Sequence, residues 1–270
     1  PNEERRARKP GLPMRDQSDY EEINSIKAEF TDIYDACDPR PYFHTLSEFG
    51  YQIPQNARPV FEQIFDACRN SRDLDALTVL DVGCSYGVNA ALLKYDIDLA
   101  DLYTHYNDPA LADLDRSEHI LSDAAILGDE TDAPSLKIIG LDIAGNAVAY
   151  ACAAGMLDGG IVADLETAPL DEEAAERVAD VDVIISTGCI GYVGEETFNR
   201  LLARADHRTP PWVSSFVLRM FPYGPIAERL ADFGLVTEKL EGRTFVQRGF
   251  ESADEKAGAL TRLHDLGRDS

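Results

Sequence analysis

One segment of nine residues combines an apolar run, a carboxylate and a glycine-rich turn. It reads Val79-Leu80-Asp81-Val82-Gly83-Cys84-Ser85-Tyr86-Gly87, and a helical pattern follows from Val88 to Tyr95. Glycines let a backbone turn tightly and pass close to a ligand, and the first N–H groups of a helix have no partner inside it. A strand that ends in such a turn can therefore hold a ligand carboxylate at the helix N-terminus.

Two later apolar runs also carry an aspartate at their end. Asp142 ends the run from Lys137, and Asp164 ends the run from Gly160. Because the carboxyl ends of parallel strands meet at one edge of a sheet, we expect both acids beside the glycine-rich turn, where α/β proteins bind ligands. There Asp142 could accept the two hydroxyls of a ribose, and Asp164 could accept the amino group of an adenine.

Together these segments resemble the motifs of class I S-adenosylmethionine-dependent methyltransferases. The segment from Asp81 is similar to motif I, Asp142 and Asp164-Leu165 to motifs II and III, and Ser186-Thr187-Gly188 to motif IV. The resemblance covers about residues 56–250 and implies S-adenosylmethionine as cofactor, with in-line methyl transfer to oxygen, nitrogen or carbon of a small molecule. The cofactor contacts that it implies are Asp81, Gly83, Cys84, Ser85, Gly87, Asp142, Ile143, Asp164, Leu165, Ser186 and Thr187.

Two features depart from the family pattern. Ser85 stands where motif I commonly has its middle glycine, and its hydroxyl could reach the cofactor carboxylate. The interval from Gly87 to Asp142 is far longer than the usual ~20 residues, so an insertion over residues 98–135 has to account for the excess. If the second strand lay elsewhere, Asp142 would not be the ribose acid.

The same turn allows other interpretations. Gly83-Cys84-Ser85-Tyr86-Gly87 matches G-x-S-x-G, which would make Ser85 a hydrolase nucleophile that needs His207 or His264. A nicotinamide fold needs G-x-G-x-x-G, and the turn fails two of those positions. A turn without a ligand is a third interpretation, but the series of strand-end acids favours cofactor binding. Two further hypotheses keep the cofactor: an enzyme that uses it without methyl transfer, as in a cyclisation, or a non-catalytic regulatory partner.

Strand and helix patterns alternate through most of the chain, which predicts a Rossmann-like α/β fold with helices on both faces of a mostly parallel sheet. We expect seven strands. Five lie within residues 78–83, 137–142, 160–164, 181–186 and 212–221. The last two, Leu235–Leu240 and Thr244–Gln247, flank Glu241-Gly242-Arg243 and predict an antiparallel hairpin.

The expected organisation has four parts. Residues 1–18 form a disordered tail, 19–70 an N-terminal helical cap, 71–252 the cofactor-binding domain with residues 98–135 as an inserted lid, and 253–270 a C-terminal helix and tail. Within the cap we expect helices over 19–37 and 56–69, separated by an irregular aromatic segment over 42–51.

Composition restricts the partners. The net charge of -24 repels phosphate backbones, which disfavours nucleic acid as substrate, although solubility or a salt-adapted host explains the acidity equally well. No run of about 18 apolar residues exists, so no membrane span is expected. Five scattered cysteines without a CxxC pair indicate a reduced, cytoplasmic protein, and five histidines without ligand spacing give no sign of a metal site.

The irregular segments supply candidates for the acceptor site. His44 and His105 are the candidate catalytic bases, and each has the alternative of a packed or exposed histidine. Cys189 is a candidate nucleophile whose alternative is a small buried side chain. The candidate substrate contacts, with ordinary packing as the alternative, are Tyr42, Tyr51, Tyr106, Tyr192 and Tyr223.

Overall fold

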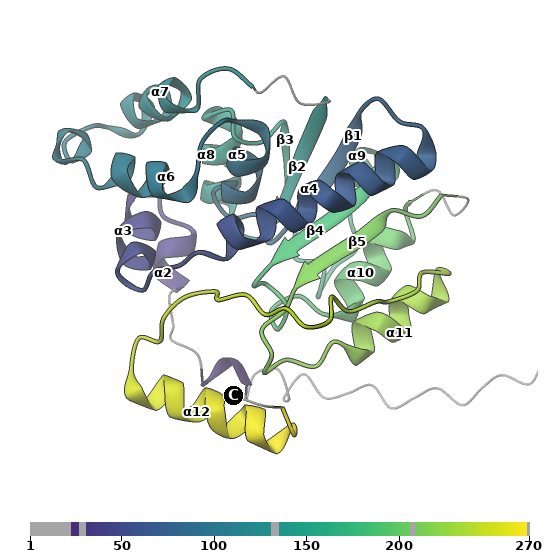
Figure 1. The fold of residues 1–270 in the computed structure, drawn as a ribbon. Helices are drawn as coiled ribbons and strands as arrows, with labels where there is room; N and C mark the ends of the chain where they lie inside the picture. Colours follow the sequence, from purple (N-terminus) through teal and green to yellow (C-terminus); the bar gives the residue numbers. More distant parts are fainter. Residues whose placement is uncertain (1–22, 27–30, 131–134, 206–208, 269–270) are drawn as a thin grey trace, which may run out of the picture.

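A computed structural model of the protein describes residues 23–26, 31–130, 135–205 and 209–268. Within them, five strands form one parallel sheet in the order β3-β2-β1-β4-β5 (Figure 1). The strands are β1 (Leu77–Val82), β2 (Leu136–Asp142), β3 (Gly159–Val162), β4 (Val183–Thr187) and β5 (Trp212–Phe216). The prediction of an α/β fold with a parallel sheet is therefore confirmed.

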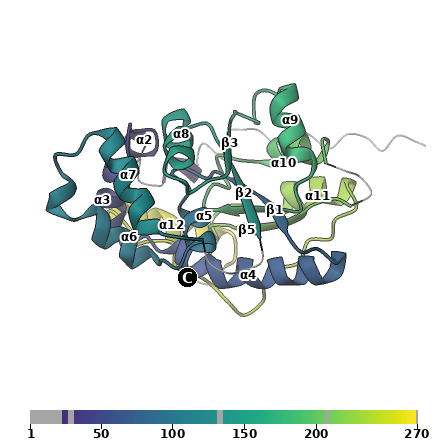
Figure 2. The ribbon, with the colours of Figure 1, turned by 90° about the horizontal axis from the view of Figure 1, so that it is seen from above.

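Helices cover both faces of the sheet, because alternate strand residues point to opposite sides. Val79 and Val183 pack in one core with α3 (Arg40–Glu48), α4 (Ile53–Arg72), α5 (Val88–Lys94), α6 (Leu99–Tyr106) and α8 (Gly145–Ala153). Leu80 and Ile184 pack in the other core with α9 (Glu172–Ala179), α10 (Glu195–Leu202), α11 (Gly224–Asp232) and α12 (Ala253–Asp265). Figure 2 shows α4 on one side of the strands and α9, α10 and α11 on the other.

The expectation of seven strands and an antiparallel hairpin is wrong for the described residues. The turn exists, with Gly242 at φ 72, but residues 235–240 and 244–247 form no ladder with each other. Backbone groups of the second segment bond to the cap instead: Gln52 N–H donates to the Gln247 carbonyl at 2.8 Å, and the Asn56 amide to the Val246 carbonyl at 2.9 Å. Residues 235–252, here called the C-terminal strap, thus run from α11 to α12 along the carboxyl edge of the sheet (Figure 1).

The cap contains a helix where an irregular segment was expected. α3 begins at Arg40, directly after Pro39 and with Pro41 in its first turn. Proline is tolerated there because the first N–H groups of a helix have no intrahelical partner. Tyr42, Phe43 and Leu46 then lie on one buried face. The expected tail over 1–18 and parts of the helix over 19–37 lie outside the described residues, which include α2 (Thr31–Tyr34).

The insertion between β1 and β2 consists mainly of helices: α6, the short 3-10 helix η1 (Pro109–Leu111) and α7 (Arg116–Leu127). Asp98 and Asp115 each accept a backbone N–H of the first turn in a capping box, which explains where α6 and α7 begin. Phe43 of α3 stacks on Tyr106 of α6 with ring centroids 4.1 Å apart. The cap and the insertion therefore share one hydrophobic core.

A buried carboxylate fixes the insertion to the sheet domain. Asp123 of α7 is fully buried and accepts hydrogen bonds from Tyr106 Oη at 2.5 Å, Tyr150 Oη at 2.6 Å and His105 Nε2 at 2.8 Å. Burial, reinforced by the Asp123 charge, raises the pKa of both tyrosines, so their hydroxyls stay protonated donors. Since Tyr150 belongs to α8, Asp123 links the insertion to a helix that covers the sheet.

We predict that Asp123→Ala lowers the free energy of unfolding by about 3 kcal/mol or more, because two buried tyrosine hydroxyls and the partly buried His105 lose their acceptor at once. Urea denaturation followed by circular dichroism measures the change. The control is Asp113→Ala, which removes an exposed carboxylate from the same insertion. A loss below about 1 kcal/mol in Asp123→Ala would show that this network does not hold the insertion.

Candidate functional site

The turn after β1 has a backbone that only glycine fits at two positions. Gly83 and Gly87 have φ values of 72 and 75, in the left-handed region. A Cβ at Gly83 would lie 2.6 Å from the Cβ of Cys189, and a Cβ at Gly87 would lie 3.1 Å from that of Ala151. Gly83 N–H donates to the carbonyl of Leu141 at 2.8 Å, so the turn begins against the end of β2.

Asp142 joins the end of β2 to this turn. Its Oδ2 accepts the N–H of Ser85 at 2.8 Å, and its Oδ1 accepts the N–H of Ala144 at 3.0 Å. Ser85 has φ 47, a strained value for a residue with a side chain. β2 pairs in register with β1 and ends at Asp142, so the long interval from Gly87 is filled by the insertion and does not displace the strand.

The Ser85 hydroxyl is buried and bonds to none of the described residues. A hydrolase would need a histidine at this oxygen. The described histidines bond elsewhere: His44 to the Tyr106 carbonyl, His105 to Asp123, and His119 to the Leu111 carbonyl, while His264 is 91% exposed beside Asp265. His207 lies outside the described residues. The structure therefore gives no support to a Ser85 nucleophile.

Asp81 lies beneath the turn and is fully buried. The Asn89 amide donates to its two carboxylate oxygens at 3.1 and 3.2 Å and to Thr187 Oγ1, at the end of β4, at 3.1 Å. Asn89 Oδ1 is buried and has no hydrogen-bond partner among the described residues. The sequence interpretation missed Asn89, although a lone amide in the apolar run Val88–Leu93 was a signal.

Apolar side chains are exposed at the carboxyl ends of three strands. Ile143 follows β2, Val162 ends β3 and Tyr192 follows β4, with 71%, 58% and 60% of their surface exposed. Ile143 and Val162 lie at the ends of the neighbouring strands β2 and β3, where they form an apolar surface that fits a flat aromatic ligand, whereas β1 separates them from Tyr192. Sequence reasoning placed Ile143 among the cofactor contacts and Tyr192 among the substrate contacts, and it missed Val162.

Asp164 and Leu165 lie in the loop after β3. The exposed Asp164 carboxylate accepts the N–H of Glu166 at 3.0 Å and the hydroxyl of Thr167 at 2.8 Å. The Leu165 side chain is buried, and its carbonyl accepts Arg200 at 2.8 Å. These bonds fix the loop, and the Asp164 oxygens keep lone pairs for a further donor.

The end of β4 carries polar groups and a protonated thiol. Ser186 Oγ donates to Ser215 Oγ of β5 at 3.0 Å, and the hydroxyl of Tyr223 lies 3.5 Å from the same oxygen. Burial, with Asp81 and Asp142 nearby, raises the pKa of Cys189 to about 12. Its Sγ donates to the Val82 carbonyl at 3.3 Å. Cys189 is thus a half-buried, protonated thiol that packs against the turn, and Cys84 is buried on the β2 side of it.

Three of the tyrosines expected at the substrate lie in an aromatic cluster. Tyr42 contacts Tyr51 and Tyr86 edge-on or tilted, with ring centroids 6.2 and 5.5 Å apart, and Tyr106 stacks on Phe43. Tyr42, Tyr51 and Tyr106 are all buried. Their packing joins the cap to the glycine-rich turn through Tyr86, and contact with a substrate stays a prediction for each of them.

Burial raises the pKa of Asp81 from its usual 3.8 to about 7, against the lowering effect of the Asn89 hydrogen bond. The folded protein therefore keeps this proton up to about pH 7, whereas the unfolded chain releases it near pH 4. The contribution of Asp81 to the free energy of unfolding is therefore fully present below about pH 4 and is lost as pH rises to 7. At pH 8 this loss amounts to roughly 3–4 kcal/mol.

We predict that Asp81→Asn is more stable than the wild type at pH 8, by about 2–4 kcal/mol, and that this gain shrinks toward pH 4.5. Urea denaturation at both pH values measures the difference. Asp180→Asn, at an exposed position, should leave the pH dependence unchanged. If the free energy of unfolding changes with pH equally in Asp81→Asn and in the wild type, the raised pKa of Asp81 is contradicted.

Features outside this site constrain the function little. In the described ranges, no three histidine, cysteine or acidic side chains gather in a way that could hold a metal ion. Of the helices described, none has the length and apolar character to cross a membrane.

Comparison with family models, with curated proteins and with solved structures finds no match. We therefore infer function from the geometry of the site alone.

Proposed function

We propose that the protein binds S-adenosylmethionine at the carboxyl edge of a Rossmann-like sheet and transfers its methyl group to a small molecule. The observation that carries the proposal is the bond between Asp142 and Ser85 N–H. It brings the acid after β2 and the glycine-rich turn after β1 into one site, although 57 positions separate them in the chain.

The strand order supports this location. β1 has β2 on one side and β4 on the other, so the chain leaves β1 in one direction and later returns on the opposite side. Open α/β sheets bind nucleotide ligands at the carboxyl edge of such a switch point. Asp81, Asp142 and Thr187 all lie at or near the ends of these three strands.

The residues at the edge fit the parts of this cofactor. The buried Ser85 hydroxyl lacks a partner in the described chain and can donate to the methionine carboxylate. Asp142 can accept ribose hydroxyls beside its two backbone bonds. Ile143 and Val162 offer apolar contact to the adenine ring, and Asp164 can accept its amino group. When bound, the cofactor supplies a methyl group on a positively charged sulfur.

Charge favours this cofactor over a nicotinamide dinucleotide. The chain carries a net charge of -24, and Asp142 places a carboxylate directly at the turn where a dinucleotide would place phosphates. An acidic edge attracts a cationic sulfonium and repels a pyrophosphate. The protein contributes alignment and exclusion of water, which an in-line displacement needs most.

All five cysteines are free, which supports a cytoplasmic location.

Calorimetric titration with S-adenosylmethionine, S-adenosylhomocysteine and NADH tests the proposal. We expect micromolar binding of the first two, because both carry the amino acid, ribose and adenine groups that the site fits, and none of the third, because an acidic edge repels a pyrophosphate. Absence of binding by both adenosyl compounds would overturn the proposal. Formation of S-adenosylhomocysteine during turnover would separate methyl transfer from a cyclisation and from a non-catalytic regulatory role.

We predict that Asp142→Ala weakens S-adenosylhomocysteine binding by about 5- to 150-fold, which corresponds to about 1–3 kcal/mol. The substitution removes the ribose acceptor and frees the Ser85 N–H at once. Asp180→Ala is the control, because Asp180 is exposed at the end of α9 next to the opposite edge of the sheet. Equal affinities of Asp142→Ala and the wild type would place the ribose elsewhere.

A further inference from the structure

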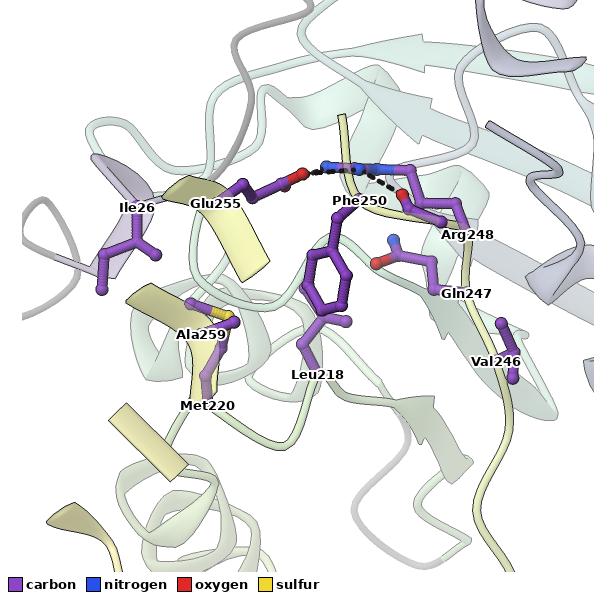
Figure 3. Close-up of a pocket in the computed structure, with 10 residues that line it drawn as sticks. Ile26, Leu218, Met220, Val246, Gln247, Arg248, Phe250, Glu255 and Ala259 are labelled. Carbon is purple, nitrogen blue, oxygen red and sulfur yellow. Dashed lines mark hydrogen bonds and ion pairs between the residues drawn. The ribbon is translucent and has the colours of Figure 1, made fainter. Parts of the chain in front are cut away.

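A cavity of about 280 Å³ lies between the C-terminal strap, α12 and the loop that follows β5 (Figure 3). Its volume is close to the lower end of the range for small-molecule sites, about 300–1,000 Å³. Most of its lining is apolar. The lining residues are Ile26, Leu218, Met220, Val246, Phe250 and Ala259, together with Gln247, Arg248, Gly249 and Glu255.

Gln247 connects this cavity to the proposed methyl-transfer edge. A Cβ built on Gly188, the residue after β4, would lie 2.5 Å from Gln247 Nε2, so the carboxamide stands directly over the end of β4. The Gln247 backbone is held by Gln52 N–H, at 2.8 Å. Figure 3 shows the Gln247 side chain pointing into the cavity, toward Phe250.

The charged side chains of the lining neutralise each other. Arg248 forms a two-pronged ion pair with Glu255, at 2.5 and 3.1 Å, and Glu255 also accepts the N–H of Glu251 at 2.8 Å. Arg248 and Glu255 are the charged groups in the described lining. The overall charge of -24 further disfavours an anionic occupant. The Gln247 carboxamide is thus the uncharged polar group that faces the cavity.

We infer that this cavity holds the methyl acceptor, and that the acceptor is a small uncharged molecule. Its apolar body contacts Leu218, Met220 and Phe250, while a single hydroxyl or amino group bonds to the Gln247 carboxamide beside the end of β4. This inference rests on the proposed function, because it needs the cofactor at the neighbouring strand ends. It adds the chemical class of the substrate and the residue that recognises its polar group.

The test uses 2-naphthol, a flat apolar molecule with one hydroxyl, in the presence of S-adenosylhomocysteine. We expect 2-naphthol to bind, naphthalene to bind several-fold more weakly because it lacks the hydroxyl, and 2-naphthoate not to bind because it is an anion. An interligand nuclear Overhauser effect between 2-naphthol and S-adenosylhomocysteine then reports whether the cavity opens onto the cofactor.

Two variants locate the binding. Gln247→Leu keeps the size of the side chain and removes its amide. It should therefore weaken the binding of 2-naphthol about fivefold and leave the affinity for naphthalene unchanged. Leu218→Trp fills the cavity and should abolish binding of both compounds. The control is Val236→Ala, at an exposed strap position outside the cavity. Circular dichroism and S-adenosylhomocysteine affinity check that each variant is folded.

The outcomes separate the two proposals. If S-adenosylhomocysteine binds but 2-naphthol does not, or if both cavity variants bind 2-naphthol as the wild type does, the cavity is not the acceptor site and the proposed function stands. If 2-naphthoate binds more tightly than 2-naphthol, the inference that the methyl acceptor is uncharged is wrong. If S-adenosylhomocysteine itself does not bind, the proposed function fails and the acceptor role fails with it.

Discussion

The hydrogen bonds of the Asp142 carboxylate determine how the carboxyl edge of this protein is built. One oxygen holds the strained Ser85 N–H and the other holds Ala144 N–H, so the turn after β1 and the loop after β2 share one acceptor. Because Ser85 has φ 47, its backbone depends on this support. The buried Ser85 hydroxyl, the exposed Ile143 and the start of α8 are all positioned relative to that carboxylate.

Segments far from the sheet in sequence complete the edge. Tyr42 of the cap packs against Tyr86 of the turn, and Asp123 of the insertion accepts a hydrogen bond from Tyr150 of α8. On the other side of the edge, the C-terminal strap brings Gln247 over Gly188. The two proposals place cofactor and acceptor in two neighbouring regions of the same edge, one formed by the strand ends and the other by the strap and α12.

The sequence predicted the parts of the fold that depend on local signals. Apolar runs that end in Asp142 or in Gly83 predicted β1, β2 and the turn between β1 and α5, because burial and backbone freedom are local properties. The hairpin was wrong because the partner of Gln247 is Gln52, and no local pattern reveals so distant a partner. α3 was missed because its aromatic segment was expected to be irregular, although Pro39 and Pro41 stand where a helix can begin. Asn89 was missed because its role depends on Asp81 and Thr187 in space.

The pairing of the strap with the cap also affects how the protein is made. The Asn56 amide and the Val246 carbonyl are 190 positions apart, so they can meet only after the ribosome has added the residues between them. Such long-range contacts close large loops and form late in folding. The sheet and the glycine-rich turn can assemble on a growing chain, whereas the wall beside Gly188 awaits Gln247. The wall beside Gly188 is therefore synthesised after all five strands of the sheet that it covers.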